Sequence, residues 1–203
     1  MNPVKAVVFD LGKVLVDFDY AIAARRILPR STAGAVQLQR WIADSALFRD
    51  YETGLLTTEQ FFTAVQAAIG FRGDLAEFGH YFADIFTPIP AMVSLHEEIR
   101  NRGLPTYIFS NTNELSARHI HRRFPFYGRF TGHVLSCEHQ AMKPDPRLYE
   151  VLERMAGLNG ADLLYVDDRP ENIETGRQRG WQVVLHQTPA ETRTQFRRAG
   201  VVA

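Results

Sequence analysis

Residues 6–12 read Ala-Val-Val-Phe-Asp-Leu-Gly, a short apolar run that ends at the carboxylate of Asp10. Four apolar residues are too few for an ordinary helix, and Val and Phe favour strands. Because apolar residues do not alternate with polar ones, both faces of this strand are expected to be buried, as in a parallel sheet. The stretch therefore predicts a central strand with an acidic side chain at its carboxyl end.

Further apolar runs of the same kind follow at 106–109, 163–166 and 182–185, with a weaker one at 132–135. Helical patterns at 90–102, 113–123, 145–155 and 171–179 lie between them. We expect Asn111 and Glu114 to form the capping box of the second of these helices. Strands that alternate with helices in this way predict an α/β fold, with a Rossmann-like, doubly wound parallel sheet.

The stretch from residue 20 to residue 86 has a different pattern and contains no strand signal. Thr57 and Gln60 have capping-box spacing ahead of a helical apolar stripe, and a second striped helix is expected over 74–86. We therefore predict a small helical cap domain at 20–86, inserted into a core domain formed by 1–19 and 87–203.

Composition narrows the classes of function. The 203 residues contain 23 Lys and Arg and 23 Asp and Glu, so nothing in the charge balance favours nucleic acid or a membrane surface as a partner. No apolar run approaches the roughly 20 residues of a membrane span. The only cysteine, Cys137, can form no internal disulfide. We expect a cytoplasmic protein; the sequence gives no indication of its oligomeric state.

Polar side chains follow the predicted strands at the points where the strands end. Asp10 follows the first strand, Ser110 and Asn111 follow the second, and Asp167 with Asp168 follows a later one. Ligands of parallel sheets bind beyond the carboxyl ends of the strands, so we expect these groups to converge there. Lys143, ahead of the helix at 145–155, is expected to join them.

This set of side chains suits phosphoryl transfer. Carboxylate oxygens are ligands that Mg²⁺ prefers, and a metal together with a lysine can neutralise a phosphoryl group. A carboxylate held against phosphorus can attack it and form an aspartyl-phosphate. Each residue alone is more often a turn, cap or surface residue, so the prediction rests on the ordered combination. The expected substrate is a small phosphorylated metabolite.

The motifs resemble those of the haloacid dehalogenase (HAD)-like hydrolase superfamily. They are residues 9–15 (FDLGKVL), 109–113 (FSNTN), 143–146 (KPDP) and 166–173 (VDDRPENI), in the order of that family. The inserted helices resemble the C1 cap of its subfamily I. Within the superfamily, the chain is most similar to bacterial α-D-glucose-1-phosphate phosphatases. The resemblance therefore implies a magnesium-dependent phosphatase, with sugar phosphates as favoured substrates.

The resemblance also implies roles for individual residues. Asp10 is expected to be the nucleophile and, with Asp168 and the Gly12 carbonyl, a Mg²⁺ ligand. Asp167 and Asn172 are expected to support the metal ligands or the water molecules on the metal. Ser110 and the Asn111 backbone are expected to bind phosphoryl oxygens. Lys143 is expected to balance the charge of the nucleophile and the phosphate.

Gly12 departs from the family pattern, which usually has a general acid–base Asp at this position. Two alternatives therefore stay open. One is a 2-haloacid dehalogenase, which also lacks this Asp but needs no metal; the retained Asp167-Asp168 pair argues against it. The other is a catalytically silent relative that acts as a binding or regulatory protein. The group that protonates the leaving oxygen is not identified by the sequence.

Overall fold

The protein is built around a five-stranded parallel sheet of order β5-β4-β1-β6-β7. The structure is a computed structural model that describes residues 3–36, 38 and 46–203. The observed fold confirms the expected α/β class. All four strong strand predictions and the weaker one are found, and two strands extend one residue further, to the polar residue at the strand end. The bounds are β1 Ala6–Phe9, β4 Thr106–Ser110, β5 Gly132–Leu135, β6 Leu163–Asp167 and β7 Gln182–Leu185.

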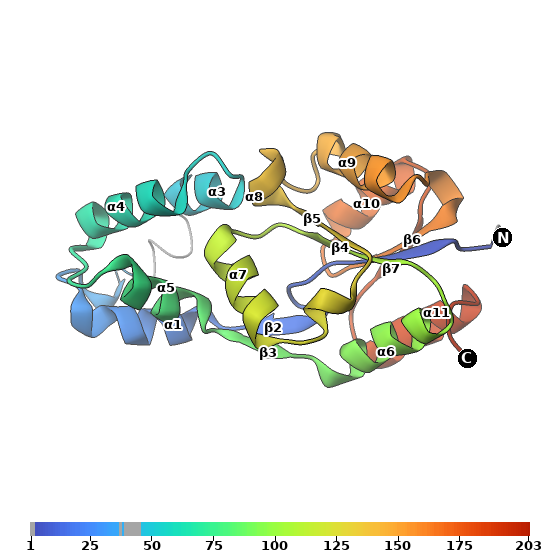
Figure 1. The fold of residues 1–203 in the computed structure, drawn as a ribbon, viewed down its shortest axis with the longest axis horizontal. Coiled ribbons are helices and arrows are strands. Elements are labelled where there is room, and N and C mark those ends of the chain that lie inside the picture. Colours follow the sequence, from blue (N-terminus) through green and yellow to red (C-terminus); the bar gives the residue numbers. More distant parts are fainter. Residues whose placement is uncertain (1–2, 37, 39–45) are drawn as a thin grey trace.

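Helices cover both faces of the sheet (Figure 1). Helices α9 (Pro146–Ala156) and α10 (Pro170–Gln178) lie on one face, and α6 (Pro90–Asn101) and α11 (Pro189–Arg198) lie on the other. Alternate residues of β1 enter separate cores: Val7 and Phe9 belong to one, and Ala6 and Val8 to the other. This two-sided burial explains why the strand has no polar alternation.

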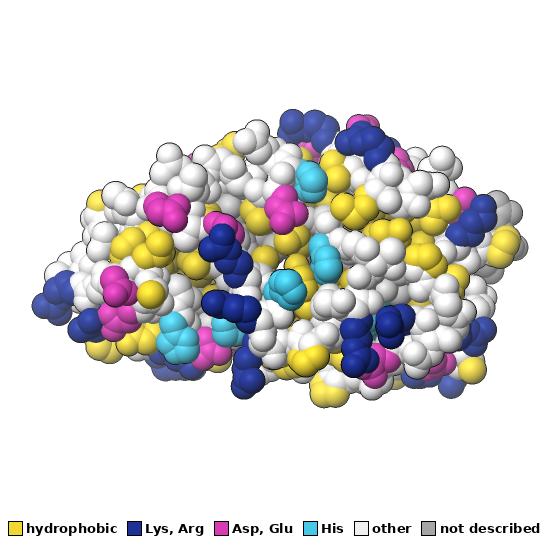
Figure 2. Space-filling view, in the orientation of Figure 1, with side chains coloured by type: hydrophobic (Ala, Val, Ile, Leu, Met, Phe, Trp, Pro, Cys, Tyr) yellow, Lys and Arg dark blue, Asp and Glu magenta, His cyan; other side chains and the backbone are white. Residues whose placement is uncertain are grey.

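Helix α7 (Glu114–Arg123) and the short α8 (Ser136–His139) follow β4 and β5. The prediction that Asn111 caps α7 is wrong, because the N-cap is Asn113, whose side chain accepts from the Ser116 N–H. The Asn111 side chain bonds elsewhere, as described below. His121, Arg122 and Arg123 are exposed in the last turn, where positive charge suits the helix dipole. Figure 2 shows basic and histidine side chains on the face of the molecule that includes α7.

A second group of helices lies to one side of the sheet (Figure 1). It comprises α1 (Tyr20–Ile27), α3 (Ala46–Glu52), α4 (Thr58–Ile69) and α5 (Leu75–Ala83), which share an apolar core of their own. The predicted capping box of Thr57 and Gln60 is present at the start of α4. Short 3₁₀ turns occupy Leu28–Arg30, Tyr127–Arg129 and Gly160–Asp162. The division into core and cap domains at residues 19/20 and 86/87 stays a prediction.

Two short antiparallel strands, β2 (Val16–Phe18) and β3 (Phe86–Pro88), carry the chain to and from these helices. The sequence did not predict them, and the expected helix over 74–86 ends at Ala83 instead. Each strand has only three residues, and only Val16 among these six is fully buried, so neither has a readable apolar pattern. None of the helices in the described part of the chain has the length and apolar character of a membrane span.

Gly54, just after α3, lies close against the backbone of α8. Its φ is +76°, and a Cβ built on it would lie 2.1 Å from the carbonyl oxygen of Cys137 in α8. We expect Gly54→Ala to lower the free energy of unfolding by about 2 kcal/mol or more. The matched control is Gly103→Ala, because Gly103 has a similar φ of +81° and no atom within 4 Å of its added Cβ. Thermal unfolding with equal losses for the two variants would show that the close approach contributes nothing.

Candidate active site

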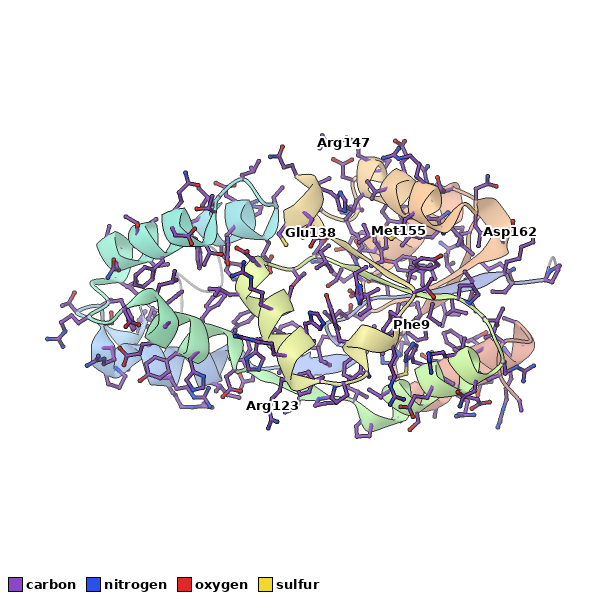
Figure 3. The ribbon with its side chains drawn as sticks, in the orientation of Figure 1. Phe9, Arg123, Glu138, Arg147, Met155 and Asp162 are labelled. Atoms are coloured by element: carbon purple, nitrogen blue, oxygen red, sulfur yellow. The ribbon has the colours of Figure 1, made fainter. Side chains whose placement is uncertain are left out.

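Three carboxylates meet at the carboxyl ends of β1 and β6. Asp10 follows β1 and Asp167 ends β6, and these neighbouring strands pair with Phe9 opposite Val166. Asp10, Asp167 and Asp168 each offer an oxygen, and the three atoms lie within 4.8 Å of one another. Phe9, labelled in Figure 3, anchors the first of them inside the molecule. Its ring packs edge-on against His96 of α6 and Phe196 of α11.

Lys143 places its ammonium group among these acids. Its Nζ lies 3.0 Å from Asp10 Oδ1 and donates to Asp167 Oδ2 at 2.6 Å and to the Phe109 carbonyl at 2.7 Å. Only 1% of its side chain is exposed. Burial alone would lower the pKa of this amine, but Asp10 and Asp167 outweigh that effect and raise it. Lys143 is therefore a buried, permanently charged group.

Asp167 is fully engaged by the protein. Besides Lys143, it accepts from the Asn172 amide at 3.0 and 3.1 Å, from the Arg169 N–H at 2.8 Å and from the Tyr165 hydroxyl. Burial raises the pKa of Asp167, but Lys143 and these hydrogen bonds lower it by a larger amount, so the net shift is downward. Asp167 is a fixed anion that orients Lys143.

Asp10 accepts fewer hydrogen bonds than Asp167. Its Oδ1 accepts from the Leu11 N–H at 2.7 Å. Burial raises its pKa to about 7, Lys143 opposes the shift, and the charges of Asp167 and Asp168 add to it. Burial and Asp167 also raise the pKa of Asp168. Three acids facing one ammonium group leave an excess of negative charge that a divalent cation would balance.

The donor set fits Mg²⁺. Asp10 and Asp168 offer carboxylate oxygens, which this hard cation prefers together with water. The Oδ1 atom of Asn172 is buried and has no hydrogen-bond partner among the described residues. It can accept from a water molecule of a hydrated cation. Gly12 lines the same cleft as these groups.

Ser110 and Asn111 lie at the end of β4, the other neighbour of β1. Ser110 is buried, and its hydroxyl donates to the Asn111 carbonyl at 3.3 Å. The Asn111 amide donates to the Lys143 carbonyl at 2.9 Å, and its Oδ1 accepts from the Lys143 N–H at 2.7 Å. This reciprocal pair holds the loop that carries Lys143 against the strand end, a task the sequence did not indicate.

A cleft of about 250 Å³ opens above the acids. Its floor includes Asp10, Gly12, Asn111, Lys143, Asp168 and Asn172, so the structure brings most of the predicted site residues to one place. Asp167 lies beneath them, and Ser110 lines a smaller adjoining cavity of about 60 Å³. The opposite wall comes from the helical group and β2: Phe18, Tyr20, Phe48 and Glu52. The sequence did not identify this wall or Tyr165, because these residues lie in stretches with ordinary core patterning.

Comparison with known proteins places this geometry in a family. The family model of haloacid dehalogenase-like hydrolases matches residues 4–180. The chain therefore belongs to the haloacid dehalogenase-like hydrolase family, as the motifs indicated.

Individual relatives are distant but cover nearly the full chain. A sesquiterpene phosphatase of Aspergillus oryzae is 23% identical over 91% of this chain and 90% of its own length. A D-ribitol-5-phosphate phosphatase of Bacteroides thetaiotaomicron is 21% identical over 95% and 97%, respectively. Among solved structures, a HAD family enzyme of Bacteroides thetaiotaomicron in a magnesium complex has a TM-score of 0.82 at 19% identity, covering 97% of this chain and 100% of that one. These similarities confirm the fold.

Proposed function

We propose that the protein is a magnesium-dependent phosphatase that hydrolyses a small phosphate monoester through an aspartyl-phosphate on Asp10. The observation that carries the proposal is the buried ammonium group of Lys143, 3.0 Å from Asp10 Oδ1, inside a cluster of three carboxylates. Such a site can hold an anion only when a cation offsets its acids. The family membership and the two phosphatases among the relatives support the same reaction.

Each residue has a distinct task in this proposal. Asp10 attacks the phosphorus atom, and Lys143 balances charge on both the nucleophile and the phosphoryl oxygens. The Ser110 hydroxyl and the Asn111 backbone bind phosphoryl oxygens. Mg²⁺, held by Asp10, Asp168 and the Gly12 carbonyl, would neutralise part of the phosphoryl charge. Asp167 and Asn172 keep Lys143 and the water molecules around the cation in place.

We further propose that residues 20–86 form a cap domain on a core of residues 1–19 and 87–203. The cap supplies Phe48 and Glu52 to the wall of the cleft, so it controls the leaving group. We favour a sugar phosphate as substrate, in keeping with the ribitol-phosphate phosphatase among the relatives. A cytoplasmic location agrees with the single cysteine, and no nucleic acid or membrane partner is proposed.

The metal requirement is directly testable. We expect EDTA to reduce phosphate release from p-nitrophenyl phosphate to background, and added Mg²⁺ to restore it, because the acids otherwise repel the phosphoryl group. Asp168→Asn should raise the Mg²⁺ concentration that gives half of the maximal rate. The control is Asp162→Asn, an acid that pairs with Lys5 away from the cleft. Full activity in EDTA would contradict the metal requirement. The metal-independent dehalogenase alternative predicts instead no phosphate release with or without Mg²⁺, and halide release from a 2-haloacid in EDTA.

The substrate class requires a panel. Release of inorganic phosphate should be measured over sugar phosphates, polyol phosphates and a sesquiterpenyl phosphate, at equal concentrations with Mg²⁺ present. We expect the highest kcat/KM among the sugar and polyol phosphates. A clear preference for the sesquiterpenyl phosphate would instead assign the aromatic wall of Phe18, Tyr20 and Phe48 to an apolar leaving group. No release from any member would favour a silent binding protein.

A further inference from the structure

Gly12 leaves the proposed reaction without a proton donor on the loop after β1. Expulsion of an alkoxide needs a proton at the leaving oxygen, and a positioned acid contributes roughly 10²–10⁴-fold. A replacement donor supplied by the protein has to lie on another side chain that lines the same cleft as Gly12. Glu52, the last residue of α3, lines both the 250 Å³ cleft with Asp10, Gly12 and Asp168 and the adjoining 60 Å³ cavity with Gly12 and Ser110.

The main chain at Glu52 is fixed against the sheet edge. The Ser136 hydroxyl donates to the Glu52 carbonyl at 2.6 Å, and the same oxygen of Ser136 accepts from the Thr112 N–H at 2.9 Å. Thr112 is two residues beyond Ser110. On the preceding residue, the Tyr51 hydroxyl accepts from the Leu115 N–H at 3.2 Å. These bonds hold the end of α3 beside the end of β4, which carries Ser110 and Asn111.

The Glu52 carboxyl group is free for such a role. It is half-buried and has no hydrogen-bond or ion-pair partner among the residues that the structure describes. Burial raises its pKa to about 7, and the charge of Arg169 opposes the shift. The titratable or charged groups that face it from neighbouring elements are Tyr20 of α1, Cys137 of α8, Arg169 after β6 and Lys13 after β1. A protonated carboxyl group is thus available near neutral pH.

The other polar groups on the cleft wall do not suit this task. Lys13 is paired with Asp17 and donates to the Phe18 carbonyl at 3.0 Å. The Arg169 guanidinium is already engaged, since its Nε donates to Glu171 at 2.7 Å. Burial raises the pKa of the Tyr20 hydroxyl strongly, so it is a poor acid. Asp168 belongs to the carboxylate cluster itself.

We propose that Glu52 is the general acid and base of the reaction, supplying from the helical cap the carboxyl group that Gly12 lacks. This inference rests on the proposed phosphatase function. When Asp10 attacks phosphorus and the bond to the leaving oxygen breaks, that oxygen takes the Glu52 proton and departs as an alcohol. The Glu52 carboxylate then takes a proton from water, whose oxygen attacks phosphorus, breaks the bond to Asp10 and releases inorganic phosphate. Both groups return to their starting states.

The test uses Glu52→Gln, which keeps the shape of the side chain but cannot donate a carboxyl proton. The substrates are dinitrophenyl, p-nitrophenyl and phenyl phosphate. In this order the leaving oxygen becomes more basic, so its departure depends more strongly on protonation. The first-step rate should be read from the burst of phenol release, or from kcat/KM. We expect a loss of roughly 100-fold for phenyl phosphate, with little loss for dinitrophenyl phosphate. The fall of wild-type kcat/KM above neutral pH should disappear in the variant with phenyl phosphate.

The matched control is Glu59→Gln, an exposed acid of α4 that does not line the 250 Å³ cleft. It should behave as wild type with all three substrates. Equal losses for all three substrates in Glu52→Gln, or no loss in any, would overturn the role of Glu52. The phosphatase function would still stand in that case if the activity of the wild type depends on Asp10. A wild type that is inactive with all three, and unchanged by Asp10→Asn, would instead overturn the proposed function itself.

Discussion

Asp10→Asn is expected to lower phosphate release by roughly 10³-fold or more, because an amide cannot attack phosphorus and form the covalent intermediate. The measurement is kcat with p-nitrophenyl phosphate in saturating Mg²⁺. The substitution preserves the size of the side chain and the oxygen that accepts from the Leu11 N–H. The fold should therefore survive, as far-UV circular dichroism and thermal unfolding can check.

Two further variants separate loss of the nucleophile from loss of a local charge. Asp10→Glu retains the carboxylate but moves it by one methylene, and we expect it to be nearly as inactive, because the attack requires a fixed geometry. Asp17→Asn removes an exposed acid of β2 that does not line the cleft, and should leave kcat unchanged. Substantial turnover by Asp10→Asn would contradict a covalent role for Asp10.

Lys143→Met should impair both activity and stability. The variant leaves Asp10 and Asp167 facing each other in a buried site without their shared cation. Removing one partner of a buried ion pair costs about 3–5 kcal/mol. We therefore expect the free energy of unfolding, measured by urea titration in EDTA, to fall by about 3 kcal/mol. With Mg²⁺ present, we expect kcat to fall by about 100-fold or more because the phosphoryl charge is no longer balanced.

The matched control for this variant is Lys5→Met. Lys5 also pairs with an aspartate, Asp162, at 3.1 Å, but its side chain is 57% exposed. Exposed pairs contribute little because water screens them. The control should unfold close to wild type. If Lys143→Met were as stable as Lys5→Met, the three buried contacts of the Lys143 ammonium group would have no energetic weight.

The sheet and its acids could be predicted from the sequence for a simple reason. A strand buried on both faces requires a continuous apolar run, and the polar residue that ends the run marks the strand's carboxyl end. Phe9-Asp10 and Val166-Asp167 carry this signal, and their strands are adjacent in the sheet. The position of Lys143 followed because its loop precedes a helix with a clear N-cap at Asp145.

The features that the sequence did not indicate depend on contacts between distant segments. The Tyr165 hydroxyl bonds Asp167 from within an ordinary buried strand, and the Asn111 side chain binds the Lys143 backbone 32 residues away. Glu52 ends an unremarkable short helix, and only the packing of α3 against Ser136 and Thr112 brings it to the cleft. Strands β2 and β3 are too short for a periodic pattern, although their pairing fixes the junction with the helical group.

The central claim is that Asp10 takes the phosphoryl group beside a divalent cation, and a crystal structure with Mg²⁺ and beryllium fluoride tests it most directly. We predict tetrahedral density bonded to a carboxylate oxygen of Asp10, with one fluorine contacting the Lys143 ammonium group. We also predict a metal ion shared by the carboxylates of Asp10 and Asp168. Beryllium fluoride bound at another residue, or a metal ion that does not share Asp10 with Asp168, would contradict the account.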